Sequence, residues 1–145
     1  MESGAYKHGC FFVTLCCAGR LRRFGTVVDG LICLNDMGRA AQMVLSYLPD
    51  HIHGLQMLDH VIMPDHVHFI VYIDDEATKS LPEVVAAYKK NVTNLCSKIC
   101  RTQGIDLGRL WQRNYYEHII RDTKDFEDTR TYIYNNPIKW QAEGK

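Results

Sequence analysis

The sequence predicts an α+β fold in which helices pack on an antiparallel β-sheet. Short runs rich in β-branched and aromatic residues, as in residues 10–17 and 66–73, are typical of strands. Residues 37–48 and 82–101 instead carry apolar side chains at helical spacing. The expected order along the chain is strand, hairpin, helix, two strands, helix and a final helix, which is typical of the α+β class.

The predicted strands lie mainly in the first half of the chain. CFFVTLCC (residues 10–17) reads as a strand, and the basic segment AGRLRRFG after it reads as a loop. GTVVDGLICL (residues 25–34) is predicted to form a strand or a hairpin with its turn at Asp29-Gly30. HIHGLQMLDHVIMP (residues 51–64) and HVHFIVYI (residues 66–73) are expected to pair as antiparallel neighbours.

Two helices are predicted before the C-terminal segment, one on either side of the strand pair at residues 51–73. Asn35 or Asp36 can cap a helix over residues 37–48, and Pro49 is expected just after its end. The second helix, over residues 82–101, begins with a proline, which is favoured at the first helical position.

The C-terminal segment is predicted to hold a short strand and a helix. LWQRNYYEHIIR (residues 110–121) reads as part loop and part strand. The last helix is expected to start near residues 122–124 and to end before Pro137, because proline disfavours helix continuation.

Length and composition indicate one globular domain, residues 1–145. With 46% hydrophobic residues, it has enough core to fold without disulfide bonds or structural metal ions. The apolar stretches are too short to cross a bilayer, and the N-terminus lacks the basic-then-apolar order of a secretory signal. A cytoplasmic, nucleoid-associated protein without a membrane partner is expected. Because 17 Lys and Arg balance 17 Asp and Glu, positive charge for binding DNA would have to be concentrated locally.

The six cysteines do not predict a metal cluster. None forms a CxxC pair, and Cys96 with Cys100, one helical turn apart, would supply only two ligands. Without an export signal, idle thiols in a reducing compartment are expected.

The run MPDHVHFIVYI (residues 63–73) contains the most informative pair of residues. It reads as a strand entered from a turn, and side chains alternate between the two faces of a strand. His66 and His68 therefore share one face, where two imidazoles roughly 6–7 Å apart can bind a single metal ion. Taken alone, such a pair is more often structural. The opposite face is expected to be the core side and carries Val67, Phe69, Val71 and Ile73.

The last predicted helix presents a second pair. Tyr132 and Asn136 are four residues apart, so they lie above one another on one helical face. Phe126 and Ile133 point elsewhere and can anchor the helix on the sheet. If the Tyr132 face meets the histidine face, it brings together two imidazoles, an amide ligand and a nucleophile.

This set of groups fits cleavage of a phosphodiester by a tyrosine. A free phenol, with a pKa of about 10, is a weak nucleophile until it is activated. A divalent ion with three protein ligands keeps open positions for phosphate oxygens and offsets developing negative charge. Imidazole ligands favour Mn²⁺ over the strictly oxygen-loving Mg²⁺. A tyrosine ester keeps the cleaved end activated for a second strand, which suits strand exchange better than hydrolysis.

Three segments of the chain carry a family resemblance. MPDHVHFIV is similar to an MPNHVH-type strand, WQRNYYEHIIRDTKDFEDTRTYIYNNPIKW to a WQ…YEH.IR…YI..NP block, and FFVTLCCAGRLRRFG to an N-terminal strand and its following loop. In order and spacing, the chain resembles the single-tyrosine HUH transposases, where U is a hydrophobic residue. The REP-associated tyrosine transposases are the most similar group.

The resemblance implies a ferredoxin-like antiparallel sheet with the HUH strand central and a C-terminal helix that carries the tyrosine. It implies Mg²⁺ or Mn²⁺ as cofactor, with His66, His68 and Asn136 as metal ligands and Tyr132 as the catalytic nucleophile. The implied activity is that of a DNA endonuclease and strand transferase in transposition and recombination. It acts on single-stranded DNA near hairpins and leaves a 5′-phosphotyrosine and a free 3′-OH. Members are often dimers, some with exchanged tyrosine helices; a homodimer stays open here.

Three departures from the family pattern bear on the activity. Asp65 stands where asparagine is usual, and the net charge is zero where a DNA-handling enzyme is usually basic. The chain also stops soon after the NP motif, so the extra C-terminal DNA-binding surface of longer members is expected to be missing.

Basic and aromatic residues outside the metal site are candidates for binding DNA. Trp111 could stack on unpaired bases, as could Tyr115 and Tyr116, although core packing is an alternative for each. Glu117 and His118 either orient a ligand or form a salt-bridged strand end. The phosphate-contact candidates, which could equally be a solvated basic face, are Arg20, Arg22, Arg23, Lys89, Lys90 and Arg113.

Two function classes follow. The first is the metal-dependent tyrosine endonuclease and strand transferase, favoured because a pure binder needs no such combination of histidines, tyrosine and amide. The second is a domesticated, non-cleaving DNA-binding protein on the same fold, favoured by the neutral charge and the short C-terminus. A phosphohydrolase acting on small molecules would normally carry additional carboxylate ligands.

Overall fold

The computed structural model describes residues 8–144 and confirms the predicted α+β class. A four-stranded antiparallel sheet has the strand order β4-β5-β1-β6. The predicted hairpin forms a separate two-stranded sheet. The strands are β1 (Gly9–Cys16), β2 (Gly25–Val28), β3 (Leu31–Leu34), β4 (Leu55–Met63), β5 (His66–Ile73) and β6 (Tyr116–Ile120). The α-helices are α1 (Asp36–His51), α2 (Leu81–Thr102) and α3 (Thr123–Ala142), and a short 3₁₀ turn covers Ala18–Arg20.

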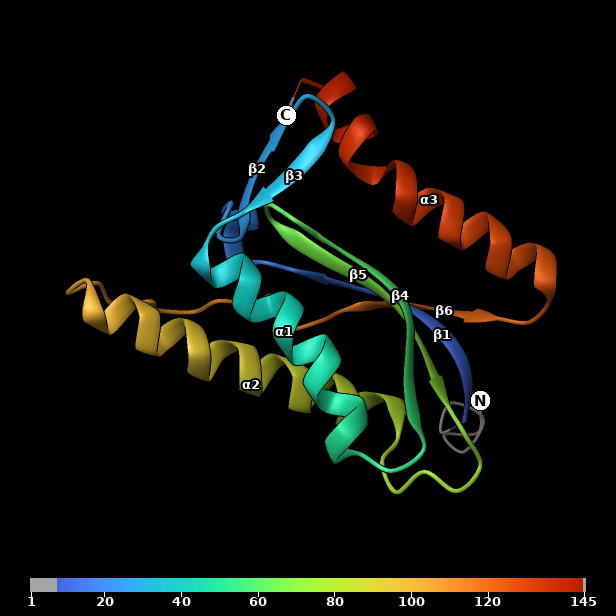
Figure 1. Cartoon of the computed structure of the whole chain (residues 1–145). Coiled ribbons are helices and arrows are strands. Elements are labelled where there is room, and N and C mark those ends of the chain that lie inside the picture. Colours follow the sequence, from blue (N-terminus) through green and yellow to red (C-terminus); the bar gives the residue numbers. More distant parts are fainter. Residues whose placement is uncertain (1–7, 145) are drawn as a thin grey trace.

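The helices divide between the two faces of the sheet (Figure 1). Helices α1 and α2 cover one face, and α3 runs along the other. The histidine strand β5 lies inside the sheet between β4 and β1, as the family resemblance implied. The β2–β3 hairpin projects towards the C-terminal end of α3, where the backbone N–H of Gly30 donates a hydrogen bond to the side-chain oxygen of Gln141.

Most of the buried apolar surface lies between the sheet and the pair α1 and α2. The core face of β5 is the one that alternation predicts, because its apolar side chains pack there with those of both helices. A smaller cluster holds α3 on the opposite face. Its buried members are Phe12, Ile70, Ile120 and Ile133, with Phe126 packed against them. The predicted anchoring of α3 by Phe126 and Ile133 is therefore confirmed.

Two helix ends differ from the prediction. Pro49 lies inside α1, which continues to His51, and Pro137 lies inside α3, which continues to Ala142. A proline inside a helix removes one hydrogen bond and crowds the preceding turn. In α3 the residues beyond Pro137 gain burial in return, since Trp140 is only 5% exposed. Tertiary packing therefore outweighs the local preference of proline.

The N-terminal caps follow the sequence signals. The side chain of Asn35 accepts a hydrogen bond from the backbone N–H of Gly38 at 2.9 Å, and Asp122 accepts one from Asp125 at 2.8 Å. Within residues 8–144, no helix has the length and hydrophobicity that crossing a membrane requires.

Candidate active site

The sheet face that meets α3 carries the predicted histidine pair. Cross-strand pairing places Cys16 beside His66, and Thr14 beside His68, on β1 and β5. Both imidazoles are buried, and their ring centroids are 4.6 Å apart. The two rings are therefore close enough to share a ligand between them.

Each histidine has its Nδ1 atom engaged by a neighbouring side chain. Nδ1 of His66 lies 2.6 Å from a carboxylate oxygen of Asp65, and Nδ1 of His68 lies 2.9 Å from the hydroxyl of Thr14. Because a carboxylate only accepts, Nδ1 of His66 donates, and Nε2 keeps its lone pair in the neutral ring. Nε2 of His68 is buried and has no hydrogen-bond partner among residues 8–144. A buried nitrogen left in this way fits a metal ligand.

Electrostatics keep the second imidazole neutral. Burial, together with the electrostatic influence of the neighbouring His66 and Arg20, lowers the pKa of His68 to about 3. A neutral imidazole is the form that binds a metal. Burial by itself would raise the pKa of Asp65. The hydrogen bonds that Asp65 accepts from His66 and Arg20 outweigh this effect and hold its pKa below the usual value.

Helix α3 brings Tyr132 and Asn136 to this pair. The Tyr132 ring centroid is 5.4 Å from that of His68, and the Tyr132 side chain is 43% exposed. Asn136 is buried and, with Tyr132, lines a hollow of about 300 Å³ that we call the histidine hollow. The other residues lining it are Thr14, Cys16, Arg20, His66, His68, Lys139, Trp140 and Glu143.

This donor set fits a divalent ion with a mixed coordination shell. No group of three or more histidine, cysteine or carboxylate side chains within the described part of the chain could hold a metal ion. A metal bound to His66 and His68 would therefore take its remaining ligands from the amide of Asn136 and from the substrate.

Several residues of the site were not predicted from the sequence. Asp65 is the hydrogen-bond partner of His66, and the others line the hollow: Thr14, Cys16, Lys139, Trp140 and Glu143. Lys139 Nζ lies 5.4 Å from the Tyr132 ring centroid. Lys139 and Trp140 follow Asn136 by three and four residues, so they share its helical face. This spacing would have revealed them if the helix had been expected to pass Pro137. Thr14 depends on the register between β1 and β5, which the sequence does not display.

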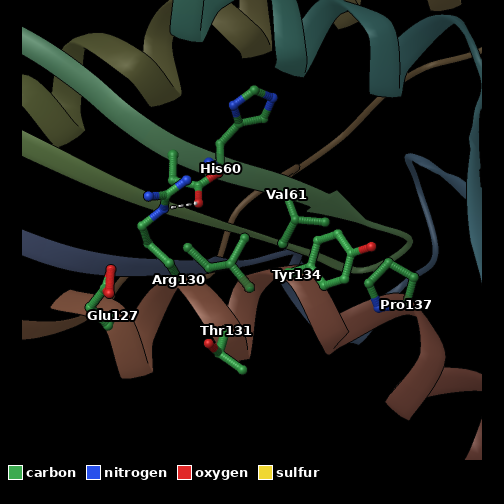
Figure 2. Close-up of a pocket in the computed structure, with 9 residues that line it drawn as sticks. His60, Val61, Glu127, Arg130, Thr131, Tyr134 and Pro137 are labelled. Atoms are coloured by element: carbon green, nitrogen blue, oxygen red, sulfur yellow. Dashed lines mark hydrogen bonds and ion pairs between the residues drawn. The ribbon is translucent and has the colours of Figure 1, made fainter. Parts of the chain in front are cut away.

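A different groove lies on the other side of α3, between this helix and the edge strand β4 (Figure 2). It measures about 550 Å³, and Arg130 Nε crosses it to a carboxylate oxygen of Asp59 at 3.2 Å. Tyr134 and Pro137 also line it, but neither histidine of the pair does. The ion pair between Arg130 and Asp59 links α3 to the sheet. The groove itself carries no part of the proposed chemistry.

The predicted DNA-contact residues separate into two groups. Arg20 lines the histidine hollow, and the guanidinium carbon of Arg22 lies 5.3 Å from the Trp140 ring centroid, so both lie beside the site. The others do not line this hollow. Arg23 donates to the carbonyl of Leu107 at 3.1 Å. On α2, across the sheet from α3, Lys89 donates to the carbonyls of Gln112 and Arg113 at 2.9 and 3.3 Å, and Lys90 is exposed.

Trp111 does not have the position that base stacking requires. It is only 7% exposed, and its ring packs against Phe24 and Tyr88 at centroid distances of 5.5 and 6.0 Å. The expectation that Trp111 stacks on DNA is corrected for this reason. Of the other two rings considered, Tyr115 is half-buried and Tyr116 is 59% exposed.

Glu117 and His118 point to different surroundings. His118 Nε2 lies 3.0 and 2.9 Å from the two carboxylate oxygens of Asp125, so it ties β6 to the first turn of α3. One carboxylate oxygen of Glu117 is buried without a hydrogen-bond partner in the described residues. Neither residue lines the histidine hollow.

Comparison with known sequences decides the family. The sequence model described as "Transposase IS200 like" matches residues 42–136, which include both histidines, Tyr132 and Asn136. The chain belongs to the IS200-like transposase family. This membership places it among the tyrosine transposases, as its motifs implied.

Curated relatives agree with this assignment. A putative REP-associated tyrosine transposase of Haemophilus influenzae is 35% identical over 97 residues, covering 67% of this chain and 49% of the relative. The REP-associated tyrosine transposase of Escherichia coli K12 is 34% identical over 82 residues, covering 54% and 42%. The chain thus matches about half the length of these two transposases. An uncharacterised H. influenzae protein is 29% identical over 157 residues, covering 94% and 84%.

Solved structures share the fold. A REP-associated tyrosine transposase bound to a REP hairpin matches with a TM-score of 0.57 at 24% identity, covering 92% of this chain and 68% of that one. A putative transposase from Deinococcus radiodurans matches with a TM-score of 0.58 at 15% identity, covering 88% and 91%. Both likenesses support the α+β fold described above.

Proposed function

We propose that this transposase is a metal-dependent endonuclease and strand transferase that acts on single-stranded DNA near hairpins through a 5′-phosphotyrosine. The observation that carries the proposal is the histidine hollow. It places the Tyr132 ring 5.4 Å from a buried histidine whose Nε2 has no partner in the described chain, and it adds the amide of Asn136. A protein that only binds DNA has no use for this combination.

The residues present fit a divalent cation, with Nε2 of His66, Nε2 of His68 and the side-chain oxygen of Asn136 as its protein ligands. When bound, Mg²⁺ or Mn²⁺ would polarise the scissile phosphate and offset its negative charge. Asp65 and Thr14 hold the two rings through Nδ1 and so direct Nε2 to the ligand. The two imidazoles favour Mn²⁺.

The covalent step follows from the position of Tyr132. Its phenolic oxygen attacks the phosphorus and gives up its proton to solvent. The bond from phosphorus to the 3′ oxygen of the preceding nucleotide breaks, and that oxygen takes up a proton as a free 3′-OH. The ammonium group of Lys139 lies close to the Tyr132 ring, where its positive charge can offset the negative charge that develops on the attacked phosphate. Attack by another 3′-OH on the phosphotyrosine reverses these steps, which joins a new strand and restores the phenol.

Hairpin-bearing DNA is the proposed substrate because a solved relative is described as bound to a REP hairpin. Arg20 and Arg22, beside the hollow, are the proposed phosphate contacts. Locally placed cations of this kind can bind DNA although the whole chain has no net charge. The homodimer stays a prediction, which light scattering of the protein in solution tests.

A labelling experiment tests the chemistry and its polarity. A hairpin oligonucleotide with single-stranded flanks is labelled at either end and incubated with protein and Mn²⁺, and the products are separated on denaturing gels. A 5′-phosphotyrosine carries the 3′ label into the protein band and leaves the 5′ label on the released strand. Chelation of the metal should abolish the adduct.

Matched tyrosine variants identify the nucleophile. Tyr132→Phe should give no adduct, whereas Tyr134→Phe, two residues along the same helix, should react as wild type does. Absence of any adduct from the wild-type protein would overturn the proposed activity. An adduct from Tyr132→Phe would overturn the role of Tyr132.

A further inference from the structure

A second hollow lies on the β6 side of Tyr132. It measures about 540 Å³ and shares Thr14, His68 and Tyr132 with the histidine hollow. Its own part of the wall includes Phe12 and Tyr116, and we call it the aromatic hollow. Tyr132 therefore stands at the boundary between two hollows that open on the same sheet face.

The register of the sheet explains this arrangement. Thr14 on β1 pairs with His68 on one side and with Tyr116 on the other, so these three residues form one row across the sheet. Neighbouring strands lie about 4.8 Å apart, which separates the β5 and β6 ends of the row by roughly 10 Å. One or two nucleotides span such a distance. A strand whose phosphate meets His68 can therefore place a neighbouring base over Tyr116.

The two hollows differ in chemistry. Arg20 and Lys139 line the histidine hollow, whereas no lysine or arginine is among the described residues that line the aromatic hollow. Each hollow also has one carboxylate, Glu143 in the first and Asp128 in the second. One oxygen of Asp128 accepts a hydrogen bond from Lys124 at 2.8 Å, and the other can accept one from a base. A phosphate is thus favoured in the first hollow and an uncharged ring in the second.

Tyr116 supplies the surface on which such a ring would stack. Its side chain is 59% exposed although it lies beside the proposed nucleophile, and its ring centroid is 6.5 Å from that of Phe12. Stacking on an aromatic side chain is the usual way in which proteins hold unpaired bases. His118, held by Asp125, borders the same space from β6.

We propose that the aromatic hollow binds one unpaired nucleobase next to the scissile phosphate, with Tyr116 as its stacking platform. This inference rests on the proposed function, because the DNA strand that reaches Tyr132 is what delivers the base. The site would position the backbone for attack by fixing the nucleotide beside the reacting one.

The test uses the Tyr132→Phe background, in which binding is measured without covalent chemistry. Hairpin oligonucleotides carry the fluorescent base 2-aminopurine at successive single-stranded positions. One position should be quenched on binding. Tyr116→Ala should remove that quenching and weaken affinity by about 5- to 150-fold, the range expected for one stacked base. Tyr116→Phe should retain both, since the ring remains.

Two controls separate stacking from other effects. Tyr134→Ala removes an equally large ring that is 79% exposed and lines the other groove of α3, and it should change neither signal. The salt dependence of binding should keep its slope in Tyr116→Ala, because no phosphate contact is lost. An abasic site at the quenched position should weaken DNA binding by the Tyr132→Phe protein that keeps Tyr116. It should have little further effect on binding by the protein that also carries Tyr116→Ala.

The inference is overturned if no position is quenched, or if Tyr116→Ala binds and quenches like its parent. Failure of the proposed function has a different signature, which is the absence of an adduct from protein with an intact Tyr132. Quenching at one position without any adduct would show a base site on a non-cleaving binder.

Discussion

Thr14 and His68 are paired across β1 and β5, and the hydroxyl of Thr14 lies 2.9 Å from Nδ1 of the imidazole. When Nδ1 donates its hydrogen to this hydroxyl, Nε2 keeps its lone pair and is the ring nitrogen of His68 left to bind a ligand. Asp65 does the same for His66 through a contact of 2.6 Å. Both rings are therefore oriented by protein groups before any metal arrives, which reduces the entropy lost on binding.

Asp65 should matter for metal affinity through its hydrogen bond and not through its charge alone. Asp65→Ala should weaken Mn²⁺ binding by about 10- to 100-fold, the usual effect of removing a group that orients a ligand. Asp65→Asn keeps an oxygen that can accept from Nδ1 and should retain most of the affinity. Titration calorimetry with Mn²⁺ measures both. Equal losses in the two variants would show that the charge, not the hydrogen bond, is what counts.

The stability of the metal-free protein should fall as the pH drops from about 6.5 towards 3. In this window an unfolded chain protonates His68, but the folded protein, in which burial lowers the pKa of His68 to about 3, does not. The unfolded state thus binds more protons, and folding loses free energy as acid is added. Urea unfolding at several pH values measures the slope. His68→Gln should flatten it, whereas His53→Gln, at an exposed position, should not.

The thiols should react in an order set by burial. Cys33 is exposed, whereas burial raises the pKa of Cys17 and of Cys96 to about 12. Because the thiolate is the reactive form, a thiol reagent at about pH 8 should modify Cys33 first and should reach Cys17 and Cys96 only after unfolding. Mass spectrometry after timed labelling reads the order. Cys33→Ser should remove the fast phase, and rapid labelling of Cys96 in native protein would contradict the packing of α1 against α2.

Helix α3 depends on a small apolar cluster for its position. Ile133 is buried in that cluster, so Ile133→Ala should lower the free energy of unfolding by about 2–5 kcal/mol. Ile138→Ala, at an exposed position five residues along the same helix, should change it by less than about 0.5 kcal/mol. Chemical denaturation of the two variants compares them. Because Tyr132 precedes Ile133, adduct formation should also fall in Ile133→Ala.

The sequence is sufficient to predict the strands, the hairpin and the sharing of one face by His66 and His68. These features depend on period-two alternation and turn residues, which are local properties of the chain. The pairing of Tyr132 with Asn136 is equally local, because helical spacing alone relates them. The prolines misled the prediction of helix ends, since burial of Trp140 beyond Pro137 is a tertiary effect.

The tertiary structure decided which residues meet across the sheet. Strand register brought Thr14 and Tyr116 into the row of His68, and packing buried Trp111 while leaving Tyr116 exposed. The sequence by itself determined the two candidate pairs, His66 with His68 and Tyr132 with Asn136, because each pair lies within one element. Only the fold could join the two pairs, since the contact of α3 with the sheet depends on long-range packing of apolar side chains.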